Sequence, residues 1–372
     1  MSNHSFARYT VLCLHLAGVV QSIHRETSDA AAATEEEEMG NYTYITLADE
    51  SKVSIFEMDP ETGALTYKKD VGLSGGPGPI ATDRNEEFMY IGIRSTCEIA
   101  SFRIDKGSGD LEALGIISLD ADPCYMFVDR TGKFLLSSYY RAGKVTVHAI
   151  GEDGAAGALV TEVPTAEHAH CIQTDRSNRF AFVPHTVPPN SIFQFVFNAD
   201  NGSLTPNTPG KVKRPAGEGP RHFVFHPFKD VVYVSNENGS SVTAYRFDTG
   251  NGTLEDFQTL STLPEGFTGE NTCAQIHMTP CGRMLFVTNR GHDTIACYSI
   301  DIDTGRMASV GQQKTEPVPR VFNLDPSGKF LFAAGQGSGK VEAFRVDADA
   351  GLTTSIGTYD VGKQPMWVQI LR

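Results

Sequence analysis

The sequence repeats a short, acidic, glycine-containing turn seven times, and this repeat limits the possible folds more than any other feature. Each turn ends a stretch of alternating polar and apolar residues, and its glycine supplies the positive φ that a hairpin requires. The glycines are Gly63, Gly109, Gly154, Gly202, Gly252, Gly305 and Gly351, at steps of 45 to 53 residues. A period of this length, with four short strands in each unit, is typical of β-propeller blades.

A second marker precedes an apolar strand in six of the units and keeps the same period. It begins at Asp83, Asp129, Asp175, His226, Thr279 and Asp325, and an apolar residue stands five positions later in each. Two independent markers with one period predict an all-β, seven-bladed propeller with four antiparallel strands per blade. The main alternative, a pair of β-sandwiches, fits the unbroken period poorly.

The two ends of the repeat region predict how the ring closes. The region starts with what reads as a second strand, over 42–47, and finishes with an isolated first strand, over 366–371. We expect this C-terminal strand to join the N-terminal blade, because that pairing hides the open edges. The predicted organisation is a leader over 1–40 and a single propeller domain over 41–372.

The leader differs in composition from the repeats. Arg8 precedes an apolar run that is interrupted by His15, and four glutamates follow at 35–38. This pattern suits either a disordered leader, with Met39 as an alternative start, or a signal peptide. We expect a cytoplasmic protein, and a periplasmic or secreted protein is the alternative if residues 1–40 contain a signal peptide.

Charge and cysteine content exclude several classes of protein. A net charge of −14 argues against a surface that binds nucleic acid, and no run of about 18 apolar residues predicts a membrane span. Seven cysteines without a C-x-x-C pair argue against a disulfide framework or a zinc site and favour a reducing compartment. We expect no cofactor, metal, nucleic acid or membrane partner, and the oligomeric state stays open.

The repeat also predicts which side chains meet at one end of the central channel. In a propeller blade the first strand lines the channel and the second runs antiparallel beside it, so the start of one lies near the end of the other. We count five residues back and eleven residues forward from each second marker. These positions include Arg94, Tyr140, His170, Arg221, Glu237, Arg290, Arg320 and Gln336.

Four arginines and a histidine around one opening of an acidic chain predict an anion site. Arginine offers a planar fork that matches carboxylate or phosphate oxygens. Glu237 is a candidate base, and His170 is a candidate partner that titrates near neutral pH. The alternative is that these charges pair with one another and only fill a solvated channel.

Several motifs resemble the lactonase family of seven-bladed β-propellers, and the likeness extends over 41–372. The motifs are Gly219–Pro227, Val234–Asn238, Asn289–Asp293 and Pro319–Gly328. The resemblance implies a site of His, Arg, Glu and Arg, which matches His170, Arg221, Glu237 and Arg290. The loop Pro184–Asn190 is longer and richer in proline than the family pattern, which leaves the identity of the substrate in doubt.

The resemblance implies hydrolysis of a sugar lactone, with 6-phosphogluconolactone as the first candidate. The arginines would hold the anion and stabilise the oxyanion, while Glu237 or His170 activates water. We expect the substrate to contact further side chains, namely Arg320, Arg94, His185, Tyr140 and Gln336. Two alternatives remain: a carboxymuconate-type lactonising cycloisomerase, and a non-catalytic propeller that binds a sugar acid or a protein.

Overall fold

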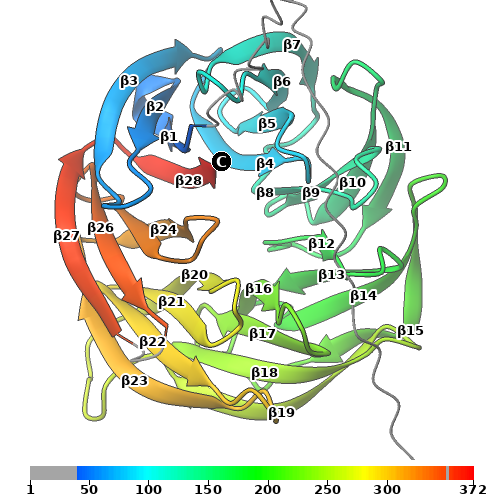
Figure 1. The fold of residues 1–372 in the computed structure, drawn as a ribbon. Coiled ribbons are helices and arrows are strands. Elements are labelled where there is room, and N and C mark those ends of the chain that lie inside the picture. Colours follow the sequence, from blue (N-terminus) through cyan, green and yellow to red (C-terminus); the bar gives the residue numbers. More distant parts are fainter. Residues whose placement is uncertain (1–39, 349–351) are drawn as a thin grey trace, which may run out of the picture. The chain divides into compact units, whose positions relative to one another are not determined.

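The computed structural model describes residues 40–348 and 352–372. These residues form seven sheets of four antiparallel strands, set as blades around a central channel (Figure 1). Within these ranges the only helix is the three-residue 3₁₀ helix η1 (Ala48–Glu50), and no helix is long and apolar enough to cross a membrane. The predicted all-β, seven-bladed fold is confirmed. The predicted leader over 1–40 lies outside the described residues, apart from its last residue.

Each blade runs from an inner strand at the channel to an outer strand at the rim. Blade one consists of β28 (Pro365–Leu371), β1 (Tyr42–Leu47), β2 (Lys52–Met58) and β3 (Leu65–Gly72). Blade two consists of β4 (Pro77–Thr82), β5 (Phe88–Ile93), β6 (Glu98–Ile104) and β7 (Leu111–Ser118). Blade three consists of β8 (Tyr125–Val128), β9 (Phe134–Tyr139), β10 (Lys144–Ile150) and β11 (Ala156–Pro164).

The remaining four blades follow in chain order. Blade four consists of β12 (Gln173–Thr174), β13 (Phe180–His185), β14 (Ser191–Asn198) and β15 (Ser203–Lys213). Blade five consists of β16 (Pro220–Phe225), β17 (Val231–Asn236), β18 (Ser241–Asp248) and β19 (Thr253–Ser261). Blade six consists of β20 (Thr272–Met278), β21 (Met284–Arg290), β22 (Thr294–Ile300) and β23 (Met307–Lys314). Blade seven consists of β24 (Pro319–Leu324), β25 (Phe330–Gly335), β26 (Lys340–Asp347) and β27 (Leu352–Asp360).

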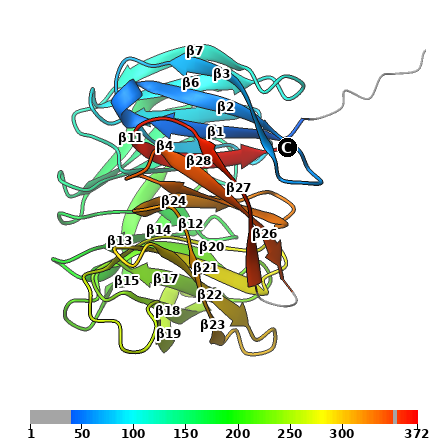
Figure 2. The ribbon, with the colours of Figure 1, turned by 90° about the vertical axis from the view of Figure 1, so that its left-hand side faces the viewer.

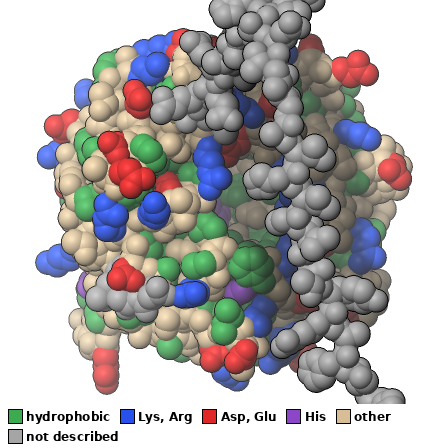
Figure 3. All heavy atoms as spheres, in the orientation of Figure 1, with side chains coloured by type: hydrophobic (Ala, Val, Ile, Leu, Met, Phe, Trp, Pro, Cys, Tyr) green, Lys and Arg blue, Asp and Glu red, His purple; other side chains and the backbone are tan. Residues whose placement is uncertain are grey.

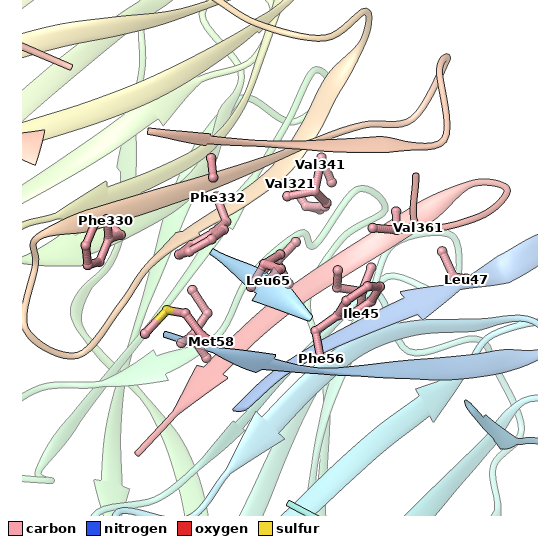
Figure 4. Close-up of a cluster of buried hydrophobic side chains, with 14 residues drawn as sticks. Ile45, Leu47, Phe56, Met58, Leu65, Val321, Phe330, Phe332, Val341 and Val361 are labelled. Atoms are coloured by element: carbon pink, nitrogen blue, oxygen red, sulfur yellow. The ribbon is translucent and has the colours of Figure 1, made fainter. Parts of the chain in front are cut away.

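The C-terminal strand closes the ring as the sequence predicts. β28 pairs antiparallel with β1, and Val368 lies opposite Ile45. Buried side chains of blades one and seven form a common apolar cluster at this junction (Figure 4). Full burial of one such side chain contributes about 1.5–3 kcal/mol, so the junction is held by packing as well as by strand pairing.

The two sequence markers contact each other between neighbouring blades. The turn glycine Gly154 has a φ of 86°, and a Cβ atom there would lie 2.0 Å from the ring of Phe88 in the preceding blade. Gly252, with a φ of 69°, approaches Phe180 equally closely. A side chain at either glycine would therefore strain the backbone and displace an aromatic ring. The shared period of the two markers reflects one contact that is repeated from blade to blade.

The aspartate that opens the second marker organises the turn between the inner and second strands. In blade four, Oδ1 of Asp175 accepts hydrogen bonds from the backbone N–H groups of Arg179 and Phe180. Its Oδ2 accepts bonds from the N–H and the hydroxyl of Ser177. Asp129 binds the equivalent groups of its own turn. The carboxylate thus pairs backbone donors that the tight turn would otherwise leave without partners.

The inner strands begin, and the second strands end, at one end of the channel. In blade five, Pro220 at the start of β16 pairs with Asn236 at the end of β17. This end, which we call the mouth, also carries η1 and lies on the left in Figure 2, whereas the C terminus lies on the right. Figures 1 and 3 view the ring from the opposite end, and the space-filling view shows acidic and basic side chains interspersed over this face.

Candidate active site at the channel mouth

A small cavity lies between the inner strands at the mouth. Its volume is about 20 Å³, which is room for about one water molecule. Every blade contributes to its lining, which includes Arg94, Cys124, His170, Arg221, Gln275, Arg320 and Trp367. These residues are far apart in the sequence, so only the closed ring brings them together.

Three of the predicted residues form a chain of ion pairs beside this cavity. Arg221 lies in β16, Glu237 directly follows β17, and Arg290 ends β21. Oε2 of Glu237 lies 2.9 Å from Nε of Arg221, and Oε1 lies 3.0 Å from Nη2 of Arg290. Arg221 lines the cavity, whereas Glu237 and Arg290 are not among its lining residues. One carboxylate therefore holds two guanidinium groups at the mouth.

The environment keeps Glu237 ionised. Its burial alone would raise the carboxyl pKa, but the charges of Arg221 and Arg290 outweigh that effect and bring the pKa below its ordinary value. A carboxylate with a lowered pKa that faces two arginines is a weak base. Glu237 is therefore suited to orienting the two arginines, and less suited to removing a proton from water.

Arg221 is buried but incompletely partnered. Its side chain is 2% exposed, yet its Nε and Nη1 groups have no well-directed hydrogen bond among the described residues. The contact of Nε with Glu237 is short in distance but poorly aligned. Burial lowers the pKa of Arg221 to about 9, against the opposing effect of Glu237. Buried donors without partners are rare in folded proteins and point to a ligand that supplies the missing acceptors.

Positive charge exceeds negative charge around the cavity. Arg94 binds Asp122, with Nη2 and Nε at 2.5 Å and 3.1 Å from Oδ2. Arg320 is half-buried and has no ion pair or hydrogen bond among residues 40–348 and 352–372. Burial and the nearby charges of Arg290 and Arg94 lower the pKa of Arg320 to about 10. Two carboxylates thus face four guanidinium groups, which leaves room for the charge of an anion.

His170 lies at the cavity and is oriented by a second histidine. Its Nδ1 atom lies 3.1 Å from Nε2 of His222, and the ring of Tyr140 packs edge-on against it with centroids 5.4 Å apart. Its backbone N–H donates to Pro184, which fixes the irregular segment before β12. Nε2 of His170 has no hydrogen-bond partner in the described part of the chain, so it is available to a substrate or water.

Burial keeps both of these histidines neutral. It lowers the pKa of His170 well below the ordinary value, and the positive charge of Arg221 acts in the same direction. The pKa of His222 is lowered well below its ordinary value by the same two causes. The lowered pKa makes His170 a weak base, as it does Glu237, but its neutral ring presents an open Nε2 acceptor at the cavity, and its protonated form is a strong acid.

The other predicted residues lie at different distances from the cavity. Tyr140 packs behind His170, and Gln336 reaches the cavity edge by donating from Nε2 to Sδ of Met366 at 3.3 Å. His185 lies away from the cavity and is fully buried. Its ring nitrogens lie 2.9 Å from the carbonyl of Val183 and the hydroxyl of Thr165, so neither is free to meet a ligand.

Sequence reasoning missed two polar residues at the cavity, His222 and Gln275. A register shift interrupts the pairing of inner and second strands near the mouth, between Pro220 and Phe223 in blade five. Blades two, six and seven shift at the equivalent place. Such a bulge breaks the alternation of side chains, so Arg221 and His222 both line the cavity although they are consecutive. Strict alternation would have placed His222 on the other face.

Comparisons with known proteins match most of the chain. A family model described as "Lactonase, 7-bladed beta-propeller" matches residues 38–370. The chain is 35% identical over 332 residues to a 6-phosphogluconolactonase of Cronobacter sakazakii, covering 89% of this chain and 98% of that protein. It is 32% identical over 333 residues to a 6-phosphogluconolactonase of Pectobacterium carotovorum, covering 90% of this chain and 99% of that protein.

The fold is also similar to that of a solved structure. The periplasmic gluconolactonase of Pseudomonas aeruginosa superimposes with a TM-score of 0.83 at 22% sequence identity. The match covers 90% of this chain and 99% of that one. At this identity the likeness concerns the fold alone.

Proposed function

The chain belongs to the lactonase family of seven-bladed β-propellers, and we propose that it hydrolyses 6-phosphogluconolactone to 6-phosphogluconate at the mouth. The observation that carries this proposal is the excess of guanidinium charge around the cavity. Four arginines face only two carboxylates there, and two N–H groups of buried Arg221 lack hydrogen bonds among the described residues. A phosphorylated lactone supplies both the negative charge and the oxygen acceptors that this arrangement needs.

In the proposed binding mode, different arginines contact the phosphate and the lactone carbonyl of the substrate. The cavity has room for about one water molecule, so most of the substrate would lie above it. Arg320, which has no ion pair among the described residues, would bind the phosphate together with Arg94. Arg221 is the more deeply buried arginine and would contact the lactone carbonyl. A water molecule in the cavity would then lie between this carbonyl and His170.

The proposed reaction uses His170 as base and then as acid. Nε2 of His170 takes a proton from water while the oxygen of that water bonds to the carbonyl carbon. The carbonyl electrons move to its oxygen, and Arg221 stabilises the resulting oxyanion. When the tetrahedral intermediate collapses, the bond to the ring oxygen breaks and that oxygen takes the proton from His170. For this role Nδ1–H of His170 donates to Nε2 of His222, which holds the ring in place.

The experiment measures opening of the two lactone rings, and closure of the open-chain carboxymuconate, by the purified full-length protein, corrected for the spontaneous reactions. Substrates are 6-phosphogluconolactone, gluconolactone and a carboxymuconate, each with wild type, Glu237→Gln and His170→Asn. We expect turnover of the phosphorylated lactone, a loss of about 10²–10⁴-fold in kcat for His170→Asn, and a loss of at least about 10-fold for Glu237→Gln. Turnover of the muconate alone would favour the cycloisomerase, and turnover of no substrate would favour a binding protein.

We also propose that the protein works in the cytoplasm. The six cysteines in the described part of the chain are all free, which is typical of a reducing compartment. Fractionation of the native host, followed by mass determination of the chain, tests this location. Recovery from the periplasm or medium as a chain shortened at its N terminus would contradict it.

A further inference from the structure

Gln275 is a buried side chain at the cavity that the mechanism above does not use. It lies in β20, is 2% exposed, and lines the mouth cavity together with His170 and Arg221. Its Oε1 atom accepts a hydrogen bond of 2.8 Å from the backbone N–H of Phe322 in the neighbouring blade. This bond ties the amide group to β24.

The hydrogen bond to Phe322 settles which way the amide faces. A backbone N–H can only donate, so the atom that it contacts must be the oxygen of Gln275. The NH₂ group therefore points away from Phe322. It has no hydrogen-bond partner within residues 40–348 and 352–372, which leaves a neutral donor with a fixed orientation beside Arg221.

Two other glutamines show that this open donor is not a general property of the fold. Gln194 accepts from Leu254 N–H and donates to the carbonyl of Pro209. Gln258 accepts from Met307 N–H and donates to the carbonyl of the same residue. Each connects neighbouring blades through an N–H group as Gln275 does, but each also uses its NH₂ group within the protein. Of these three, only Gln275 leaves its NH₂ open, and only Gln275 lines the cavity.

We propose that Gln275 is a catalytic residue whose Nε2–H donates to the oxyanion formed from the lactone carbonyl. This inference rests on the proposed lactonase function and adds a second, uncharged donor to Arg221. When the oxygen of water bonds to the carbonyl carbon, the carbonyl electrons move to its oxygen, which then accepts from both donors. A donor held in advance by Phe322 needs little reorganisation during the reaction, and this is why such groups favour the transition state over the bound substrate.

The test compares variants of Gln275 with a matched glutamine elsewhere. Gln275→Met keeps the volume of the side chain but removes its hydrogen bonds, whereas Gln275→Glu keeps an acceptor for Phe322 and removes the donor. Gln258→Met is the control, because it also breaks an inter-blade bond but lies away from the cavity. For both Gln275 variants we expect kcat to fall about 10²–10³-fold. For Gln275→Met we expect KM to change less than about threefold, and for the control we expect wild-type kcat.

The outcomes separate this inference from the function on which it rests. If wild type opens the lactone and Gln275→Glu, folded by its melting temperature, keeps kcat within about fivefold, the role of Gln275 is overturned and the lactonase function stands. A rise in KM with unchanged kcat in Gln275→Met would also overturn it, because a transition-state contact changes kcat. If wild type opens no lactone, the proposed function and the role of Gln275 both fail.

Discussion

In each blade the inner and second strands form a hairpin, and the charged side chains at its two ends differ in whether the protein supplies all their hydrogen-bond partners. At the end away from the mouth, Asp175 accepts four hydrogen bonds from its own turn. At the mouth, Arg221 is equally buried and its Nε atom lies 2.9 Å from Glu237, but its Nε and Nη1 groups make no well-directed hydrogen bond among the described residues. The first arrangement closes on itself and stabilises the fold. The second leaves N–H donors without well-directed acceptors, and these acceptors are what a bound ligand would supply.

Replacement of Arg221 should cause the largest loss of activity at the mouth. Arg221→Met deletes the donor that we place on the carbonyl oxygen, so we expect kcat/KM to fall at least about 10³-fold in a lactone assay. The melting temperature should change little, because Glu237 keeps its ion pair with Arg290 when Arg221 is replaced and is therefore not left as an unpaired buried charge. Arg103→Met, which alters an exposed arginine of β6, is the matched control. More than a tenth of wild-type activity in Arg221→Met would contradict the assignment.

Replacement of Asp175, at the end of the strands away from the mouth, should lower stability and leave activity unchanged. Asp175→Ala leaves backbone donors of the turn without partners, so the free energy of unfolding should fall by about 2–4 kcal/mol. Turnover at 25 °C should stay at the wild-type level, since the turn lies at the far end of the strand. Denaturant titration and the lactone assay measure the two quantities, and the exposed Asp200→Ala serves as control. A large loss of kcat in a folded Asp175→Ala would show that the two ends are coupled.

Substitution of Arg320 tests which residue at the mouth binds the phosphate of the substrate. If Arg320 binds the phosphate, Arg320→Met should raise KM for the phosphorylated lactone about 10- to 100-fold, the value of one charge-assisted hydrogen bond. Its kcat should change less than about threefold, and its kinetics with gluconolactone should not change. Steady-state kinetics with both lactones give the answer. Equal losses with both substrates would place Arg320 elsewhere in the site.

The neutral histidines give the mouth a pH dependence of stability. The unfolded chain protonates histidine near pH 6.5, whereas burial lowers the folded pKa of His170 and His222 well below that value. The unfolded state therefore binds more protons as pH falls below 6.5, and each such histidine lowers stability by about 1.4 kcal/mol at pH 5.5. Denaturant titrations at pH 7.5 and 5.5 should show this loss. His222→Gln should reduce it, and an unchanged difference would mean that His222 is not buried and neutral.

Most of the fold could be predicted from the sequence because each strand is bounded by a marker that performs a physical task. The expected strands over 42–47 and 366–371 agree with the observed β1 (Tyr42–Leu47) and β28 (Pro365–Leu371) to within one residue at either end. The glycine of the first marker fits against an aromatic ring, and the aspartate of the second closes a turn. Few other residue types can fill either position, so glycine and aspartate recur in the sequence with the period of the blades.

The candidate site could be predicted only in part, because counting residues assumes regular strands. The count brought together Arg221, Glu237 and Arg290, which the structure places within ion-pair distance. It missed Gln275 because of the register shift near the mouth. His185 was expected to contact the substrate, but it ends the second strand of blade four, and its buried ring packs against Phe193 instead.

We propose that the excess positive charge at the mouth selects a phosphorylated lactone. The most direct test is the ratio of kcat/KM for 6-phosphogluconolactone to that for gluconolactone, measured with the wild-type protein at neutral pH. We predict a ratio of at least about 10, the effect of one charge-assisted contact, and a fall toward 1 in Arg320→Met. A ratio near 1 in wild type would show that the arginines serve the fold or another anion, and would contradict the claim.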